Sequence, residues 1–247
     1  MQASFIDVKN LTVAYGSKII QQNLTFSVKE KDIFVIMGGS GCGKSSLLRV
    51  LMGLLKPGAG QVFYRGVDFW GNEKAQQDIL RSIGVMFQGG ALWTSRTLAE
   101  NIAIPLEQFT NLNARQIYEV ARYKLAQVGL SGFEEYYPSE ISGGMRKRAG
   151  IARALALDPD FVFLDEPSAG LDPVSSARLD ELILQLRDSL GMTIIIVTHE
   201  LASIFAVANN AVWLDAQSKT MLAEGNPHEL LKHGPEAVRK FLKREAG

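Results

Sequence analysis

A glycine-rich segment carries a lysine and serines at a spacing that could bind phosphate. It reads GGSGCGKSS from Gly38 to Ser46 and follows the apolar run Ile33 to Met37. Glycines let backbone amides approach phosphate oxygens without a Cβ in the way, and a following helix offers the positive end of its dipole. Lys44 would then reach the β- and γ-phosphates, and Ser45 would coordinate Mg²⁺. The segment predicts a nucleotide-binding loop made of Gly38, Gly39, Ser40, Gly41, Cys42, Gly43, Lys44, Ser45 and Ser46.

Cys42 lies inside this loop. A thiol near a helix N-terminus is expected to be unusually ionised. We also expect alkylation of Cys42 to impair activity, because the adduct would intrude on the β-phosphate. The alternative is that Cys42 is a small tolerated side chain, because the chemistry of the loop does not require a thiol.

A second motif places two carboxylates at the end of an apolar strand. It reads FVFLDEPSAGLD and contains Asp165 and Glu166. A strand ending in a solvated acidic turn would explain the pair by itself. Downstream of a phosphate loop, however, Asp165 is expected to hold Mg²⁺ and Glu166 to polarise the attacking water.

The elements that must position these residues alternate between strands and helices. The helix predicted over Val174–Leu190 lies between two apolar strands, which gives a β-α-β unit suited to a parallel sheet. From Leu92 to Leu157 the pattern is helical, with one helix over Ala114–Val128. Strands are predicted at Phe5–Val13, Leu24–Val28, Ile33–Met37, Gln61–Tyr64, Ile83–Phe87, Phe161–Asp165 and Met192–Thr198.

Composition limits the possible functions. The 247 residues include 26 basic and 26 acidic residues, which disfavours a nucleic-acid partner. The single cysteine excludes an internal disulfide framework, and the first residues lack the pattern of a signal peptide. We expect a reducing cytosol as the location. Because no run of 18 apolar residues exists, any membrane role is expected to depend on a partner.

Four motifs together carry a family resemblance: ISGGM at 141–145, LDEP at 164–167, SAGLD at 168–172 and THE at 198–200. The chain resembles the ATP-binding cassette (ABC) ATPases along its whole length. Their signature LSGGQ is matched except for Ile141 and Met145.

The resemblance implies an α/β fold, a P-loop NTPase ABC cassette with a RecA-like mixed-sheet core, an antiparallel β subdomain and an inserted helical subdomain. The implied organisation is a single ABC ATPase domain over 1–247. Residues 1–88 and 158–234 would form the ATP-binding core with the β subdomain, residues 89–157 the helical subdomain, and residues 235–247 a C-terminal tail.

The resemblance also implies a head-to-tail dimer of two copies of the chain, with ATP in the interface. The signature residues of one subunit would cover ATP bound at Lys44 of the other, and they are Ser142, Gly143, Gly144, Met145 and Asp172. Tyr15 corresponds to the aromatic residue that stacks on adenine. By the same resemblance, Gln88 would join the core to the helical subdomain and approach Mg²⁺ with Ser45 and Asp165. His199 would contact the γ-phosphate, and with Glu166 and Lys44 it would complete the catalytic set.

The segments FQGGALW, ENIAIPL and MRKRAGIARALALDP look like the cassettes of the Mla and Mkl type, which serve permeases linked to MCE-domain lipid carriers. This implies an ATPase for phospholipid transport that maintains outer-membrane lipid asymmetry. It would bind integral membrane permease subunits at the cytoplasmic face of the inner membrane, with an MCE-domain carrier and a STAS-domain protein as further partners. The alternative is the ATPase of a small-solute importer of the amino-acid type.

Two surface interpretations stay open. The stretch Phe87–Leu106 is rich in apolar residues, which would either form a groove for a permease helix or pack the helical subdomain itself. They are Leu92, Trp93, Leu98, Ile102 and Ile104. Likewise the tail Pro235–Gly247 would either dock on a partner or cap its own domain.

Overall fold

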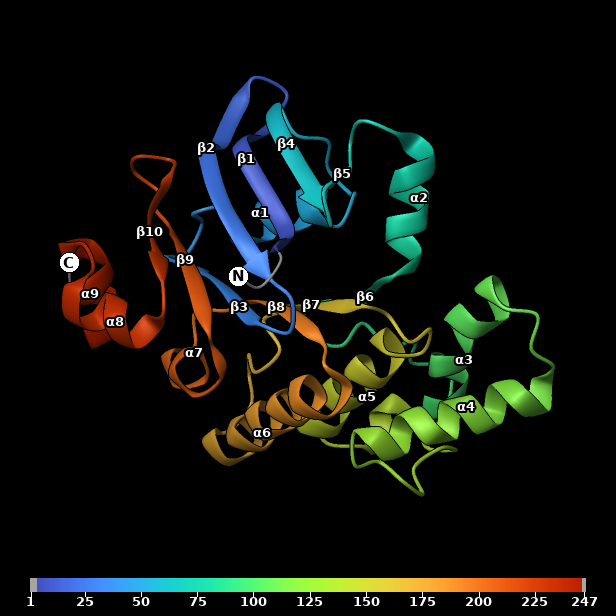
Figure 1. Ribbon diagram of the computed structural model, residues 1–247. Coiled ribbons are helices and arrows are strands. Elements are labelled where there is room, and N and C mark those ends of the chain that lie inside the picture. Colours follow the sequence, from blue (N-terminus) through green and yellow to red (C-terminus); the bar gives the residue numbers. More distant parts are fainter. Residues whose placement is uncertain (1–3, 246–247) are drawn as a thin grey trace.

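Two β-sheets form the frame of the molecule (Figure 1). The computed structural model describes residues 4–245. An antiparallel sheet has the order β2-β1-β4-β5 and consists of β1 (Ser4–Tyr15), β2 (Lys18–Lys29), β4 (Ala59–Tyr64) and β5 (Val67–Asp68). A mixed sheet has the order β10-β9-β3-β8-β7-β6 and consists of β3 (Ile33–Gly38), β6 (Ile83–Met86), β7 (Phe161–Asp165), β8 (Thr193–Val197), β9 (Asn210–Leu214) and β10 (Met221–Gly225).

The mixed sheet is parallel except for its edge strand β10, which runs antiparallel to β9. Strand β3 lies between β8 and β9, with Val35 opposite Ile196 on one side and Ala211 on the other. Both faces of β3 and β8 are buried, which explains why these strands read as unbroken apolar runs. Because β3, β7 and β8 are parallel, the segments that follow them leave the same edge of the sheet.

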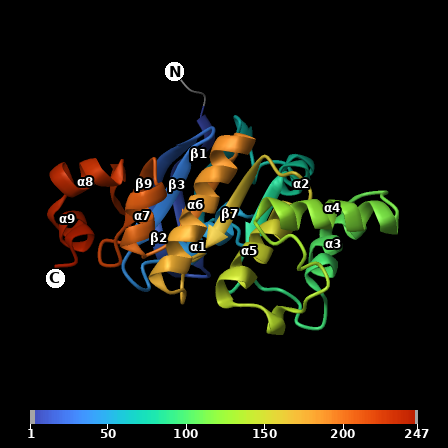
Figure 2. The same cartoon turned by 90° about the horizontal axis from the view of Figure 1, so that it is seen from below.

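Helices cover one face of the mixed sheet, and the antiparallel sheet with α1 covers the other (Figures 1 and 2). Two apolar clusters match these layers, one between the mixed sheet and the helices and the other between the two sheets. The helices are α1 (Lys44–Leu51), α2 (Glu73–Arg81), α3 (Leu98–Phe109), α4 (Ala114–Gln127), α5 (Gly143–Ala154), α6 (Pro173–Leu190), α7 (Leu201–Val207), α8 (Pro227–His233) and α9 (Glu236–Lys243), with a 3₁₀ turn η1 at Pro138–Glu140. The expected α/β fold with a mixed sheet, an antiparallel sheet and helices is confirmed.

The helical segment between β6 and β7 contains α3, α4, η1 and α5, and no strand occurs in residues 89–157, all of which the structure describes. Capping boxes at Thr97 and Asn113 start α3 and α4. Ile102 and Leu125 belong to the same apolar cluster as Ile194 of β8, so this segment shares its core with the sheet. The division into core, helical subdomain and tail remains an interpretation.

Helix α9 packs on its own chain. Val238 and Leu242 are buried, and the Phe241 ring lies 4.4 Å from the Trp213 ring, measured between centroids. Of the predicted tail and domain, residues 246–247 and 1–3 lie outside the described residues. No helix between residues 4 and 245 combines the length and the apolar character needed to cross a membrane.

Candidate functional site

The phosphate loop connects the buried strand β3 to helix α1. Two of its glycines have backbone angles that favour glycine, with φ of 75° at Gly41 and 101° at Gly43. A Cβ on Gly43 would stand 2.5 Å from Ile20, whereas a Cβ on Gly39 or Gly41 would meet no atom within 4 Å. A Cβ on Gly38 would likewise stand too close to the carbonyl oxygen of Leu214. The loop is therefore closely packed at its two ends and open between them at Gly39 and Gly41, where a phosphate cradle needs space. Because Gly43 provides no side-chain cap, the first amides of α1 are left for a ligand.

Lys44 folds back across this loop. Its side chain is buried, and its Nζ donates hydrogen bonds to the carbonyl oxygens of Gly38 (2.9 Å) and Gly39 (3.1 Å). The loop carbonyls thus hold the ammonium beside the cradle.

Gln21, which was not predicted from the sequence, holds the phosphate loop through hydrogen bonds from strand β2. Gln21 of β2 is fully buried, and its Nε2 donates to the carbonyl oxygens of Cys42 (2.7 Å) and Asp215 (2.8 Å). A lone glutamine in an amphipathic strand carries no sequence signal for this role, because its partners are backbone groups distant in the chain.

The expectation of an ionised Cys42 is wrong. The Cys42 side chain is buried in the apolar cluster between the two sheets, and burial raises the pKa of its thiol. Neighbouring Lys44 opposes this shift without cancelling it. The thiol points away from the cradle, so Cys42 is the small packed side chain of the alternative interpretation.

The two carboxylates lie where β7 ends. Asp165 is half-buried, and burial, followed by the neighbouring Glu166 charge, raises its pKa. Oδ1 of Asp165 and Oε2 of Glu166 are buried and have no hydrogen-bond partner among the described residues. Orphaned buried oxygens of this kind fit a site that is completed by a cation, a water or a substrate.

Glu166 is held in an unusual backbone conformation, with φ of 47°. Its N–H donates to the carbonyl of Val197 in β8 (2.8 Å), and its own carbonyl accepts a hydrogen bond from Nζ of Lys147 (3.1 Å). Its Oε1 lies 2.8 Å from Nδ1 of His199, just beyond the end of β8. The ends of two parallel strands therefore place the acid and the histidine together. Lys147 is buried, and burial lowers its pKa against the opposing effect of Glu166 and then Asp165.

A cleft of about 580 Å³ brings most of the predicted nucleotide residues together. It is lined by Gly38, Gly39, Ser40, Gly41, Gly43, Lys44, Ser45, Ser46, Gln88, Glu166 and His199. Ile20 and Phe241 also line it and were not predicted. Phe241 belongs to α9, and only tertiary packing brings that helix to the cleft.

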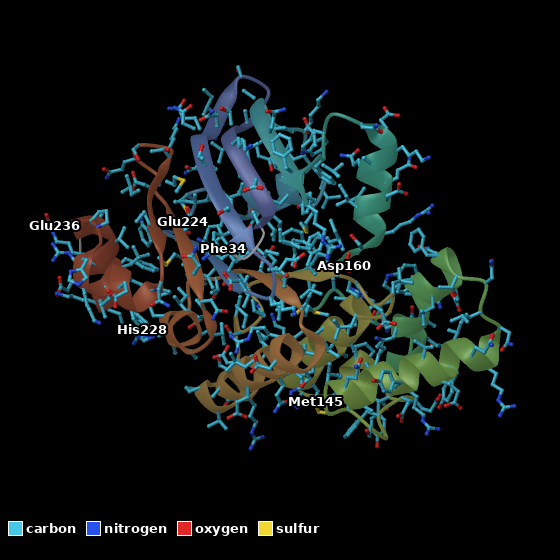
Figure 3. All side chains as sticks on the ribbon, viewed as in Figure 1. Phe34, Met145, Asp160, Glu224, His228 and Glu236 are labelled. Carbon is cyan, nitrogen blue, oxygen red and sulfur yellow. The ribbon has the colours of Figure 1, made fainter. Side chains whose placement is uncertain are left out.

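The signature residues lie elsewhere in the chain's own fold. Ser142 caps α5 and accepts a hydrogen bond from the N–H of Met145 (3.3 Å), while Asp172 caps α6. A Cβ on Gly144 would contact Ser175 of α6. Figure 3 places Met145 on the helical side of the molecule, away from Phe34 in the middle of the mixed sheet. Neither the signature residues nor Asp172 line the cleft around Lys44.

Tyr15 does not line this cleft either. It ends β1 with an exposed ring, and its hydroxyl accepts a hydrogen bond from Arg49 (3.2 Å). Its expected stacking on adenine remains a prediction.

The donor chemistry suits Mg²⁺. The hydroxyl of Ser45, the amide oxygen of Gln88 and the carboxylate of Asp165 are the oxygen ligands that this ion prefers. Within residues 4–245 no group of three or more His, Cys, Asp or Glu residues could hold a metal. A cation here would need phosphate or water oxygens as well, which is typical of magnesium sites that bind nucleotides.

Comparisons with known proteins agree with this geometry. A family model described as "ABC transporter" matches residues 21–169, more than half of the chain. The chain is 38% identical to an intermembrane phospholipid transport system ATP-binding protein MlaF of Haemophilus influenzae, over all of this chain and 93% of that protein. It is 35% identical to the Escherichia coli K12 MlaF, covering 97% of this chain and 89% of that protein. A Mycobacterium tuberculosis protein named "Probable ribonucleotide transport ATP-binding protein mkl" is 41% identical, and the match covers 96% of this chain and 66% of that protein.

Solved structures share the fold. The cbiO1 protein of Clostridium perfringens, part of the ABC transporter complex cbiONQ, superposes with a TM-score of 0.85 at 26% identity and covers 98% of this chain and 96% of its own. An ATP-binding cassette solved as a dimer with ADP and Pi in a post-hydrolysis state gives a TM-score of 0.79 at 28% identity. The match covers 90% of this chain and 98% of that cassette. Motifs, fold and relatives therefore agree that this chain belongs to the ABC transporter family, as an ATP-hydrolysing cassette coupled to transport.

Proposed function

We propose that this chain powers the transport of phospholipids between membranes. The observation that carries the proposal is the full-length similarity to MlaF proteins, which are named for intermembrane phospholipid transport. The mkl relative is named for ribonucleotide transport, and this chain spans 66% of its length. The match to MlaF covers nearly the full length of both proteins, whereas the match to mkl leaves part of that protein uncovered. We therefore give more weight to the phospholipid substrate named for MlaF than to the ribonucleotide named for mkl. The small-solute importer remains the competing hypothesis.

In the proposed ATPase cycle, the loop amides and Lys44 bind the β- and γ-phosphates of ATP. Mg²⁺ held by Ser45, Gln88 and Asp165 would neutralise charge on the phosphate oxygens. Glu166 accepts a proton from the attacking water, and its contact with His199 supports this role by restraining the carboxylate. His199 also contacts the γ-phosphate side of the cleft, and Tyr15 stacks on the adenine.

The second half of the site is proposed to come from another copy of the chain. Ser142 caps α5, and Gly143 and Gly144 begin it, so their amides could bind an anion at the helix terminus. These residues do not line the cleft around Lys44 of their own chain. Met145 and Asp172 flank the helix terminus. A head-to-tail dimer would bring this terminus onto ATP bound by the partner. The dimeric state of a solved cassette with 28% identity supports this arrangement.

An apolar groove supports a membrane-embedded partner. It has a volume of about 610 Å³ and lies among α2, β6 and α3, where its lining includes Phe87, Trp93, Ile104 and Phe109. Trp93 and Phe109 are more than half exposed. We propose that a short permease helix occupies it. Of the residues expected there, Leu98 and Ile102 are instead fully buried in the core, so this part of the stretch packs the helical segment itself.

The proposal places the chain at the cytoplasmic face of the inner membrane, held by permease subunits, with an MCE-domain carrier and a STAS-domain protein in the complex. Affinity purification of the tagged chain from detergent-solubilised native membranes, followed by mass spectrometry of proteins and lipids, tests it. Recovery of a permease with an MCE-domain protein and phospholipid is expected. Recovery of a permease with a soluble solute-binding protein would replace the proposal by the importer.

A groove variant sharpens this experiment. Phe109→Asp is expected to lose the permease while ATP binding persists, because a charge cannot be buried in an apolar contact without a large cost. Leu54→Asp is a matched control, since Leu54 is 62% exposed, close to the 61% of Phe109, but does not line the groove. Equal recovery of the permease by both variants would remove the groove from the proposed interface.

A further inference from the structure

One face of α5 contacts both segments that carry the chemistry of the cleft. Lys147, Gly150 and Arg153 recur every three residues and therefore share a face of the helix. This face meets the chain just after β6 and just after β7. Gln88 and Glu166 stand at these two positions. The N-terminus of the same helix carries the signature residues.

Gly150 and Arg153 hold the segment that follows Gln88. A Cβ on Gly150 would stand 2.9 Å from the Cα of Gly90, so the two backbones are in direct contact. The Arg153 guanidinium donates to the carbonyls of Gly90 (3.0 Å) and Ala91 (2.9 Å). The helix is therefore fastened to this loop through backbone groups.

Lys147 holds the segment that contains Glu166. Its side chain is 6% exposed, and the bond to the Glu166 carbonyl is the only hydrogen bond of its ammonium among the described residues. A buried ammonium with one partner costs free energy that an apolar side chain would not. Glu166 itself needs support, because a non-glycine residue at φ of 47° is strained.

We propose that Lys147 is a positioning residue for ATP hydrolysis, holding the left-handed backbone of Glu166 and so aiming its carboxylate. The proposal rests on the role of Glu166 in the proposed function. Lys147 does not line the cleft, so it acts through Glu166 and not on the nucleotide. Since Ser142 caps the N-terminus of α5, a displacement of this helix would be transmitted to the Glu166 carboxylate through the hydrogen bond from Lys147.

The test compares kcat and KM for ATP in the complex purified with its membrane subunits. Lys147→Met keeps the length of the side chain but removes the donor. We expect kcat to fall about tenfold or more, as for the loss of a hydrogen bond from a charged group, while KM stays within about twofold. Lys147→Arg keeps a charged donor, and kcat is expected to stay within about threefold of wild type.

Lys124→Met is the matched control for the loss of a buried lysine. Lys124 is 3% exposed, lies on α4 and pairs with Asp158, away from the cleft. We expect this variant to keep its kcat. If Lys147→Met does not fold, Lys147→Gln serves instead, with kcat reduced about threefold or more because a neutral donor remains.

Glu166→Gln separates the two proposals. If Glu166→Gln loses turnover and Lys147→Met does not, the positioning role is overturned and the proposed function stands. If Glu166→Gln keeps full turnover, the proposed role of Glu166 itself fails. If kcat falls equally in Lys147→Met and Lys124→Met, the effect of Lys147 is one of packing and the positioning role is overturned. We expect the Lys147→Met and Glu166→Gln double variant to be no slower than Glu166→Gln alone, because both changes act on the same carboxylate.

Discussion

Glu166 is the residue on which most of the local geometry converges. Its backbone is held from β8 and from α5, its Oε1 contacts His199, and its Oε2 is buried with no hydrogen-bond partner between residues 4 and 245. A carboxylate restrained on one oxygen and free on the other is suited to accept a proton from a bound water. Two parallel strands and one helix together aim a single side chain.

The change Glu166→Gln tests this role directly. Glutamine keeps the size of the side chain but cannot accept the proton, so we expect steady-state phosphate release to fall about 100-fold or more. ATP binding is expected to persist and the closed dimer to accumulate. Phosphate release, ATP binding and gel filtration with ATP measure these effects. Undiminished phosphate release would contradict the role.

Helices α6 and α7 meet at a buried polar cluster beside the segment after Glu166. Asp180 is 7% exposed and accepts a hydrogen bond from Ser203 (2.9 Å), whose hydroxyl also lies 3.4 Å from that of Ser168. Burial raises the pKa of Asp180 from 3.8 to about 6, and the bond from Ser203 offsets only part of this effect. We therefore expect the stability of the contact between these two helices to depend on the protonation of Asp180.

A raised pKa in the folded state means that the stabilising contribution of Asp180 is complete below about pH 4 and is lost as pH rises through about 6. Asp180→Asn keeps an acceptor for Ser203 and carries no charge. At pH 8 we expect the variant to be more stable than wild type, by at most about 3 kcal/mol of unfolding free energy. At pH 4 the two proteins are expected to be equal.

Urea unfolding of both proteins at the two pH values measures this difference. A variant that is less stable than wild type at pH 8 would show that the charge of Asp180 has a favourable partner in the folded protein.

At the scale of the whole molecule, the two predicted ligand-binding features do not meet within one chain. The cleft is lined by the phosphate loop, and helix α5, which carries the signature residues, begins beside α6. This separation agrees with the proposed dimer, in which each ATP would contact both subunits.

Mixing two inactive variants tests whether the phosphate loop of one subunit and the signature residues of the other form one ATP site. Lys44→Ala removes the phosphate lysine, and Gly143→Asp places a charge in the signature, so neither variant alone is expected to hydrolyse ATP. In a mixed dimer, one site would unite the intact Lys44 of one subunit with the intact signature of the other. We expect a 1:1 mixture to recover activity, up to about a quarter of wild type, because half the dimers are mixed and each has one intact site. No recovery from a mixture with proven subunit exchange would mean that the site is complete within one chain.

The sequence by itself determined the motifs from which the site is predicted and three of the central strands of the mixed sheet. Gly38–Ser46 and Asp165–Glu166 were predicted because phosphate and magnesium binding impose residue types at short fixed spacings. Strands β3, β7 and β8 were predicted because parallel strands buried on both faces are apolar throughout. The strands β9 and β10 and the helix α2 were missed. Strand β9 was missed although it is buried, whereas β10 is only partly buried and α2 buries no residue completely. Weak burial leaves a weak periodic pattern.

Only the tertiary structure decided the surroundings of those motifs. Cys42 lies two residues before Lys44 in the sequence, close to the start of a helix, but its thiol is packed in the core. Burial raises its pKa more than the neighbouring Lys44 lowers it. Gln21, Lys147 and Phe241 support or line the site from β2, α5 and α9, through contacts with backbone carbonyls or with the cleft. Such contacts join positions far apart in the chain and require no particular local pattern, so they become visible only when the sheets and helices are packed together.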